Sequence, residues 1–144
     1  MLQALSHIGI CVSNLERSIR FYRDALGFSY VSDLEVAGEP SDTLLRLEGV
    51  KLKAVYLERD GFRIELLHYA SPARKPAPRA REMNDLGLTH MSFRVDDFEA
   101  TLAALQAAGA KVLEETIVRI PGGDPLAAFL TDPDGVLIEL VNAG

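Results

Sequence analysis

Thr89-His90-Met91-Ser92-Phe93-Arg94-Val95-Asp96-Asp97 decides the fold, because a similar stretch, Ser6-His7-Ile8-Gly9-Ile10-Cys11-Val12-Ser13-Asn14, stands near the start of the chain. In both copies a histidine precedes a short apolar run, a polar pair and a segment with helical spacing. Two later stretches also match, Asp60-Gly61-Phe62-Arg63-Ile64-Glu65-Leu66-Leu67 and Asp134-Gly135-Val136-Leu137-Ile138-Glu139-Leu140-Val141. The chain is therefore a tandem duplication, with one histidine and one glutamate in each half.

The pattern of each half predicts the element order βαβββ. Alternating apolar residues predict strands, apolar residues at helical spacing predict a helix, and Asp-Gly predicts a hairpin turn. A capping box is expected at each helix start, with Ser13 or Asp96 as N-cap and Glu16 or Glu99 three residues later. The expected strands are 5–12, 28–36, 52–58, 62–69, 88–95, 111–120, 126–131 and 136–142, the expected helices are 15–26 and 98–108, and 37–50 is an irregular insertion with one helical turn at 42–47.

The chain divides into two modules and a linker. Residues 1–69 form the first module, the proline-containing segment 70–87 is the linker, and 88–144 form the second module. We expect an α+β fold in which both modules contribute to one strongly curved mixed β-sheet, with the helices on its convex side. The two modules would then make one structural domain.

Composition excludes several classes of function. The 144 residues are 48% hydrophobic, with no apolar run near the roughly 20 residues that a membrane helix needs. A single cysteine suits a reducing compartment, and the net charge of −6 argues against a nucleic-acid partner. We expect a cytoplasmic protein that binds a small-molecule substrate and no membrane. The strand edges of an open sheet also predict a homodimer.

The two glutamates give the strongest argument for a metal site. Glu65 and Glu139 each lie in the middle of a strand whose neighbours are apolar on both faces, and such strands are usually covered on both faces. A buried carboxylate costs several kcal/mol unless it is paired, neutralised or bound to a metal. Two such carboxylates at equivalent positions indicate a common cause.

Strand alternation brings the histidines to the same faces as the glutamates. His7 and His90 then join Glu65 and Glu139 in one cavity, provided that the two modules pair about a pseudo-twofold axis. Two imidazoles and two carboxylates suit Zn, Ni, Co, Mn or Fe(II), with positions left for water or substrate and no organic cofactor. The alternative is that the histidines cap strand ends and the glutamates pair with Arg63 or Arg94.

Two further side chains share the histidine faces. Arg94 lies four residues after His90 and is a candidate to bind a substrate carboxylate or phosphate, or else a structural ion-pair partner. Cys11 lies four residues after His7 and is expected to line the wall of the site. His68 is an odd number of residues from Glu65 and so should face away from the site.

The duplicated motifs resemble the vicinal oxygen chelate superfamily, which includes glyoxalase I, methylmalonyl-CoA epimerase, extradiol dioxygenases and the fosfomycin and bleomycin resistance proteins. Nearly the whole chain takes part in the resemblance. It implies that His7, Glu65, His90 and Glu139 hold the metal as in glyoxalase I, and that Glu65 or Glu139 is the base that moves a proton through an enolate or enediolate.

The chain departs from bacterial glyoxalases in the residues that bind glutathione. Cys11 stands where those enzymes carry an arginine, Tyr69 where they carry an asparagine, and Pro121 where they carry a lysine. Cys11 and Tyr69 are therefore expected to contact a different substrate. An isomerase or epimerase acting on another oxygenated or thioester substrate is consistent with the same motifs.

Three functions compete at this point. The first is a metal-dependent lyase, isomerase or epimerase. The second is an extradiol-type dioxygenase, in which His7, His90 and Glu139 would be the essential triad. The third is a binding protein without catalytic activity, such as a drug-sequestering protein, which usually lacks the metal ligands.

Overall fold

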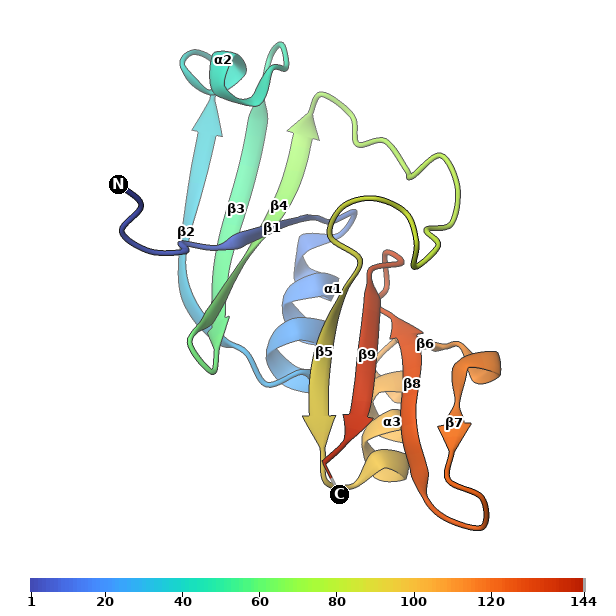
Figure 1. Ribbon diagram of the computed structural model, residues 1–144. Helices are drawn as coiled ribbons and strands as arrows, with labels where there is room; N and C mark the ends of the chain where they lie inside the picture. Colours follow the sequence, from blue (N-terminus) through green and yellow to red (C-terminus); the bar gives the residue numbers. More distant parts are fainter. Residues whose placement is uncertain (144) are drawn as a thin grey trace. The chain divides into compact units, whose positions relative to one another are not determined.

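A computed structural model describes residues 1–143 and divides the chain into two compact units, Met1–Pro76 and the part that begins at Ala77. The first unit follows the predicted order βαβββ (Figure 1). Its first strand, β1, pairs in parallel with β4, and β4, β3 and β2 follow as antiparallel neighbours. Its elements are β1 (Ile8–Cys11), α1 (Leu15–Arg20), the π-helix η1 (Phe21–Ala25), β2 (Ser29–Ala37), α2 (Ser41–Leu45), β3 (Lys51–Arg59) and β4 (Phe62–Ser71).

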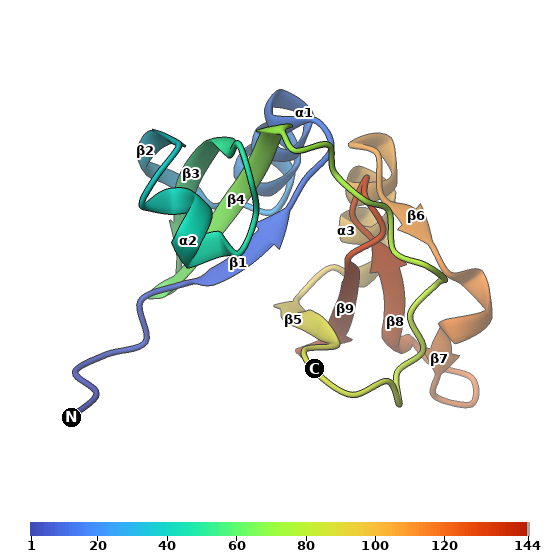
Figure 2. The ribbon, with the colours of Figure 1, turned by 90° about the horizontal axis from the view of Figure 1, so that it is seen from above.

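The second unit repeats this topology, except that its second strand is interrupted. Its first strand, β5, again pairs in parallel with the last, β9, and β8 follows as the antiparallel neighbour of β9. The helix α3 lies against one face of this sheet (Figures 1 and 2). Its elements are β5 (His90–Val95), α3 (Phe98–Ala107), β6 (Lys111–Val112), the 3-10 helix η2 (Glu114–Thr116), β7 (Val118–Arg119), β8 (Pro125–Thr131) and β9 (Leu137–Asn142).

Each unit has its own core between its helix and one face of its sheet. Burying an aliphatic or aromatic side chain stabilises the fold by about 1.5–3 kcal/mol, so these residues account for much of the stability of each unit. In the first unit the largest fully buried apolar side chains are Val12, Phe21, Tyr22, Val50, Val55, Leu57 and Leu66, and in the second they are Leu105, Leu130, Ile138 and Leu140.

The predicted fold class is confirmed, as an α+β protein with one mixed sheet in each half. The expectation that both sheet faces are covered is wrong. Along β4, Ile64 and Leu66 are buried on the helix side, whereas Glu65 and Leu67 on the other face are partly exposed. The glutamates therefore lie on the open face of each sheet, and burial alone costs them less than the sequence suggested.

The predicted strand over 111–120 is wrong, because the chain breaks it into β6, η2 and β7. The reason is Thr116, whose hydroxyl donates to the carbonyl of Leu113 and accepts the backbone N–H of Phe129 on β8. A side chain thus takes the place of a backbone ladder partner. In the first unit the equivalent strand, β2, is continuous over nine residues.

Both helix N-caps lie one residue later than predicted. The side chain of Asn14, not Ser13, accepts from the backbone N–H of Arg17, and that of Asp97, not Asp96, accepts from Ala100. The first helix also changes to a π-helix at Phe21 before Gly27 ends it with a positive φ of 72°. The predicted helices are otherwise confirmed, as is the helical turn in the insertion, which is α2.

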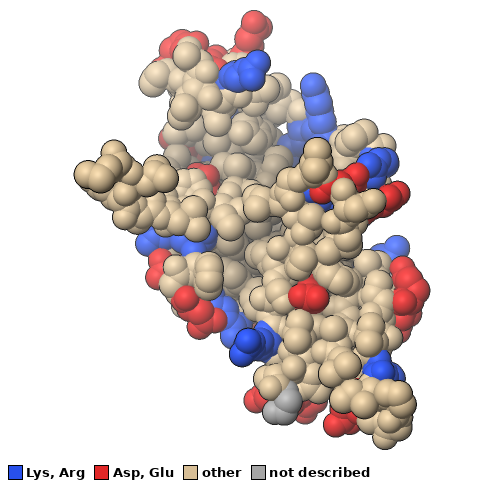
Figure 3. All heavy atoms as spheres, in the orientation of Figure 1, with Lys and Arg blue, Asp and Glu red and all other residues tan. Residues whose placement is uncertain are grey.

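Charged side chains are distributed without a basic patch on the visible face. Figure 3 shows Lys and Arg interspersed with Asp and Glu around a largely uncharged surface. No helix within residues 1–143 is long and apolar enough to cross a membrane.

Candidate metal centre in two halves

His7 and Glu65 form a close pair on the open face of the first sheet. The Nε2 atom of His7 lies 3.0 Å from Oε2 of Glu65, and the Glu65 side chain is 14% exposed. The register explains the contact, because Glu65 pairs with Gly9 across the parallel β1–β4 ladder and His7 precedes Gly9 by two residues on the same face. His7 and Glu65 therefore lie side by side within the first unit.

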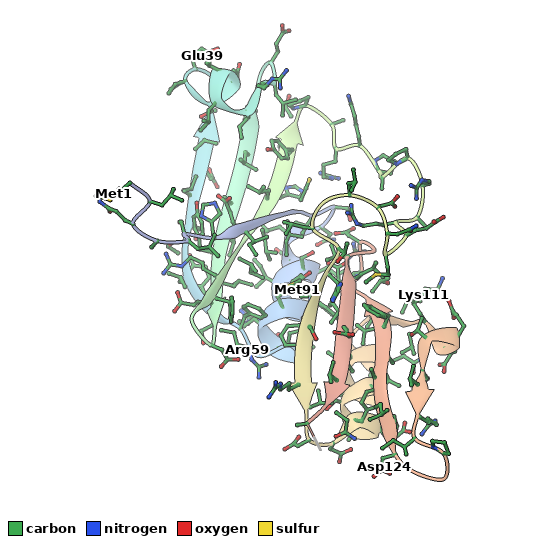
Figure 4. All side chains as sticks on the ribbon, in the orientation of Figure 1. Met1, Glu39, Arg59, Met91, Lys111 and Asp124 are labelled. Atoms are coloured by element: carbon green, nitrogen blue, oxygen red, sulfur yellow. The ribbon has the colours of Figure 1, made fainter. Side chains whose placement is uncertain are left out.

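His90 and Glu139 form the equivalent pair in the second unit. Glu139 pairs with Ser92 across the parallel β5–β9 ladder, and His90 again precedes this partner by two residues. The Nε2 atom of His90 lies 3.7 Å from Oε2 of Glu139. Figure 4 labels Met91, the residue that follows His90 on β5. The duplication thus reproduces the pair, although more loosely.

Both histidines are held in the same orientation. The Nδ1 atom of His7 lies 2.9 Å from the hydroxyl of Ser6, and that of His90 lies 2.8 Å from the hydroxyl of Thr89. A histidine that binds a metal through one ring nitrogen usually has a hydrogen-bond partner on the other. In both units the nitrogen directed at the glutamate is therefore the one available to bind a metal.

An aromatic ring supports each histidine from the strand on the far side of the glutamate strand. The ring of His7 meets Tyr56 edge to face with centroids 5.3 Å apart, and the ring of His90 meets Phe129 in the same way at 5.2 Å. Tyr56 also donates its hydroxyl to Oε1 of Glu65 at 2.7 Å. This hydrogen bond, followed by burial, raises the pKa of Tyr56.

Tyr56 is not among the residues that the duplication predicts at the site. A signal for it does exist, since a two-residue turn at Asp60-Gly61 sets the register of the β3–β4 hairpin and places Tyr56 opposite Glu65. Both turn residues have positive φ, 52° and 78°, as the expected tight turn requires. Ser92 is also a partner of the site, because its hydroxyl donates to Oε2 of Glu139 at 2.6 Å.

The alternative ion pairs for the glutamates are absent from the described residues 1–143. Arg63 donates to Glu58 instead of Glu65, at 2.9 Å. Arg94 is exposed on β5, and the contacts of Glu139 are with Ser92 and His90. Histidine and hydroxyl partners, not arginines, thus surround both carboxylates.

The expected substrate-contacting residues share the faces of the pairs. Cys11 is exposed on β1, and Tyr69 lies four residues after Glu65 on β4, on the same face. Burial, followed by the neighbouring Cys11 and Glu65, raises the pKa of Tyr69. His68 faces away, as predicted, and its Nε2 lies 3.2 Å from a guanidinium nitrogen of Arg74.

The donor atoms fit a divalent metal ion. Two ligands bonded to one ion at about 2 Å lie about 3 Å apart, which matches the His7–Glu65 distance and is slightly shorter than the His90–Glu139 distance. Within residues 1–143, no group of three or more histidine, cysteine, aspartate or glutamate side chains is assembled for a metal. Each unit supplies one pair, and the site of all four residues stays a prediction.

Comparison with known proteins identifies the family. Residues 4–140 match the family model described as the glyoxalase/bleomycin resistance protein/dioxygenase superfamily. The chain is 34% identical to the uncharacterized protein YaeR of Escherichia coli, with 96% of this chain and 95% of that protein covered. It is 31% identical to a probable lactoylglutathione lyase of Vibrio parahaemolyticus, with 94% and 87% covered.

An epimerase and a protein of solved structure are also similar to this chain. The chain is 31% identical to the ethylmalonyl-CoA/methylmalonyl-CoA epimerase of Cereibacter sphaeroides, covering 97% of this chain and 98% of the epimerase. The crystal structure of a glyoxalase family protein from Bacillus cereus has a TM-score of 0.81 at 22% identity, covering 99% and 95% of the two chains. This chain belongs to the glyoxalase/bleomycin resistance protein/dioxygenase superfamily.

Proposed function

We propose that this protein is a divalent-metal-dependent lyase, isomerase or epimerase that moves a proton beside a carbonyl group of a small oxygenated or thioester substrate. The observation that carries the proposal is the duplicated pair, in which His7 faces Glu65 and His90 faces Glu139 through the same atoms. Relatives named as a lactoylglutathione lyase and an acyl-CoA epimerase support the reaction class.

In this proposal His7, Glu65, His90 and Glu139 together hold one ion, from two units of one chain or from two chains of a homodimer. Zn, Ni, Co, Mn and Fe(II) all suit this mixed nitrogen and oxygen set. When bound, the ion would polarise a substrate oxygen and stabilise the negative charge that develops there as the proton leaves.

The protein's own groups would do the rest. A carboxylate, Glu65 or Glu139, would accept the proton from the substrate carbon and return it to a different position or face. Tyr69 and Cys11 would line the substrate, since they lie on the open face of the first sheet, and Arg94 would bind an anionic group from β5 of the second. These contacts differ from those that bacterial glyoxalases use for glutathione.

A dioxygenase is the second candidate. It would require only His7, His90 and Glu139, so Glu65 would have no role. Glu65 is, however, the glutamate that lies closer to its histidine, and both of its oxygens have a protein contact. That arrangement favours proton transfer. A binding protein without catalysis is the least supported, because both pairs are intact.

The test is metal analysis followed by a substrate panel. Protein purified without chelator should contain a divalent metal, and one substrate class among 2-oxo thiohemiacetals and acyl-CoA esters should react, with exchange of the substrate proton for solvent deuterium. Oxygen consumption with a catechol, dependent on added Fe(II), would instead establish the dioxygenase. Binding without turnover of the whole panel would favour the third function.

We also propose a homodimer. The β2 strand is an exposed nine-residue edge of the first sheet, and such edges are commonly covered by another chain. Light scattering at micromolar concentration, with metal added, should give twice the mass of the 15.7 kDa chain. A monomeric mass would contradict this assembly.

A further inference from the structure

Each glutamate has two neighbours across the ladders, and the two halves differ in which neighbour carries a hydroxyl group. Glu65 pairs with Gly9 on one side and Tyr56 on the other. Glu139 pairs with Ser92 and Phe129 at the corresponding positions. Each carboxylate therefore has one hydroxyl group beside it. In the first half this hydroxyl comes from the antiparallel neighbour of the glutamate strand, and in the second half from the parallel neighbour.

In the first unit Tyr56 bonds to the oxygen of Glu65 that does not face His7. Its hydroxyl donates to Oε1 of Glu65 at 2.7 Å, while Oε2 lies next to His7. The same ring packs edge to face on His7. Tyr56 thus contacts both His7 and Glu65. It leaves Oε2 of Glu65 directed toward His7, where an ion bound to both residues would lie.

In the second unit Ser92 bonds to the oxygen of Glu139 that faces His90. Ser92 donates to Oε2 of Glu139 at 2.6 Å, and the same oxygen is the one nearest His90, at 3.7 Å. Phe129 packs on His90 but has no hydroxyl to offer Oε1. Within residues 1–143, Glu139 is therefore held through one oxygen, and Glu65 through both.

We propose that Tyr56 is a positioning residue for metal binding, which fixes Glu65 as a ligand before the ion arrives, and that the second half lacks this restraint because Phe129 replaces it. The inference rests on the proposed metal-dependent function. It predicts that the two hydroxyl groups contribute unequally. Loss of an outer partner of a metal ligand typically weakens metal affinity about 10- to 100-fold, and the loss should be larger for Tyr56 than for Ser92.

The test measures the dissociation constant for Zn²⁺, by competition with a chromophoric chelator, in Tyr56→Phe and in the matched variant Ser92→Ala. Tyr56→Phe keeps the ring on His7 and recreates the residue found naturally at position 129. We expect it to raise the Zn²⁺ dissociation constant about 10- to 100-fold. Ser92→Ala should raise it by less than Tyr56→Phe does.

A rescue variant distinguishes the loss of the hydroxyl that positions Glu65 from a general loss of structure. Gly9→Ser combined with Tyr56→Phe moves the hydroxyl to the strand that carries Ser92 in the second half. An added Cβ at Gly9 would lie 3.9 Å from Oε2 of Glu65 and 3.2 Å from the flexible end of Leu67, so the side chain can be accommodated by a small shift. We expect part of the lost Zn²⁺ affinity to return.

The outcomes distinguish this inference from the function on which it rests. A wild-type protein that binds no divalent metal would overturn the proposed function and the inference with it. Wild-type binding together with an unchanged Zn²⁺ dissociation constant in Tyr56→Phe would overturn the role of Tyr56 alone. An equal or larger effect of Ser92→Ala would overturn the inequality between the halves.

Discussion

The two units have the same strand order and the same histidine–glutamate pairs, yet they differ in how the surrounding strands support them. In the first unit β2 is a continuous nine-residue strand on β3, and Tyr56 bonds to Glu65. In the second unit the corresponding segment is broken at Thr116, and Phe129 offers only its ring. The positions of the expected ligands are thus retained, whereas the scaffold beside them has diverged.

The comparison indicates which features the function constrains. Each histidine precedes by two residues the strand position that pairs with its glutamate. This offset requires only the parallel pairing of the first and last strands, so it survives changes in the outer strand. Variants that affect the two halves differently can show whether the divergence has also separated the roles of the two units.

The largest difference should come from the glutamates. Glu65→Gln and Glu139→Gln each keep an oxygen that can bind a metal but remove a base. The variant that removes the proton acceptor should lose about 10²- to 10⁴-fold in kcat while it retains much of the metal. The other variant should lose less in kcat. Assays on whichever substrate class reacts, with metal content measured in parallel, would compare them.

Equal and full activity of both glutamine variants would contradict proton transfer by either carboxylate. Full activity of Glu65→Gln alone would leave Glu139 as the base. The halves would then differ in chemistry as well as in scaffold.

A smaller effect is expected at the break in the outer strand of the second unit. Thr116→Val removes the acceptor of the Phe129 N–H in a partly buried position, which should cost about 1–3 kcal/mol of the free energy of unfolding. Thr101→Val, in α3, is the control, since its hydroxyl forms no hydrogen bond that stabilises a strand within the described residues. Denaturant titration would measure both.

If Thr116→Val were as stable as the wild type, the side-chain bond would not be the reason for the broken strand. A fall in stability together with weaker metal binding would show that the outer strand supports the ring on His90 through Phe129. In the first unit β2 stays one nine-residue strand paired with β3, despite a register shift between Tyr30 and Ser32.

The smallest effects should be the same in both halves. Asn14→Ala and Asp97→Ala each remove a helix N-cap and should cost about 1 kcal/mol. Ser13 accepts from the guanidinium of Arg17 and Asp96 accepts from the N–H of Asp97, so Ser13→Ala and Asp96→Ala, at the caps predicted from sequence, should also lower stability, but by less than the two N-cap variants. Thermal unfolding of the four variants would decide between the two assignments, and a larger effect at Ser13 or Asp96 would contradict the structure.

Those caps illustrate what the sequence could and could not predict. The capping-box pattern located both helix starts, but two adjacent residues, such as Ser13 and Asn14, each carry a suitable side chain, and only the backbone conformation selects one. The N-cap Asn14 has φ −141° and ψ 106°, the extended conformation from which its side chain reaches Arg17.

Strand alternation predicted that the histidines and glutamates share one face of the sheet. The contact of each histidine with the glutamate of its own half depends on the parallel register of the first and last strands, which the structure supplies. The break in the predicted strand over 111–120 could not be predicted from the sequence. Thr116 is also a good strand residue, and its hydrogen bond to Phe129 joins residues far apart in the sequence. The openness of the glutamate face was missed for a similar reason. Apolar neighbours such as Leu67 suggested a covered face, although only the helix side is fully buried.

In the proposed site the two halves of the chain share one metal ion. The most direct measurement is the number of metal ions per chain, by native mass spectrometry and elemental analysis, in the wild type, His7→Ala and His90→Ala. We expect one ion per chain in the wild type and near-complete loss of metal in either variant, because each deletes a ligand of the same site. Two ions per chain in the wild type, or a variant that keeps half of the metal, would show that each pair binds its own ion and that the halves do not share a site.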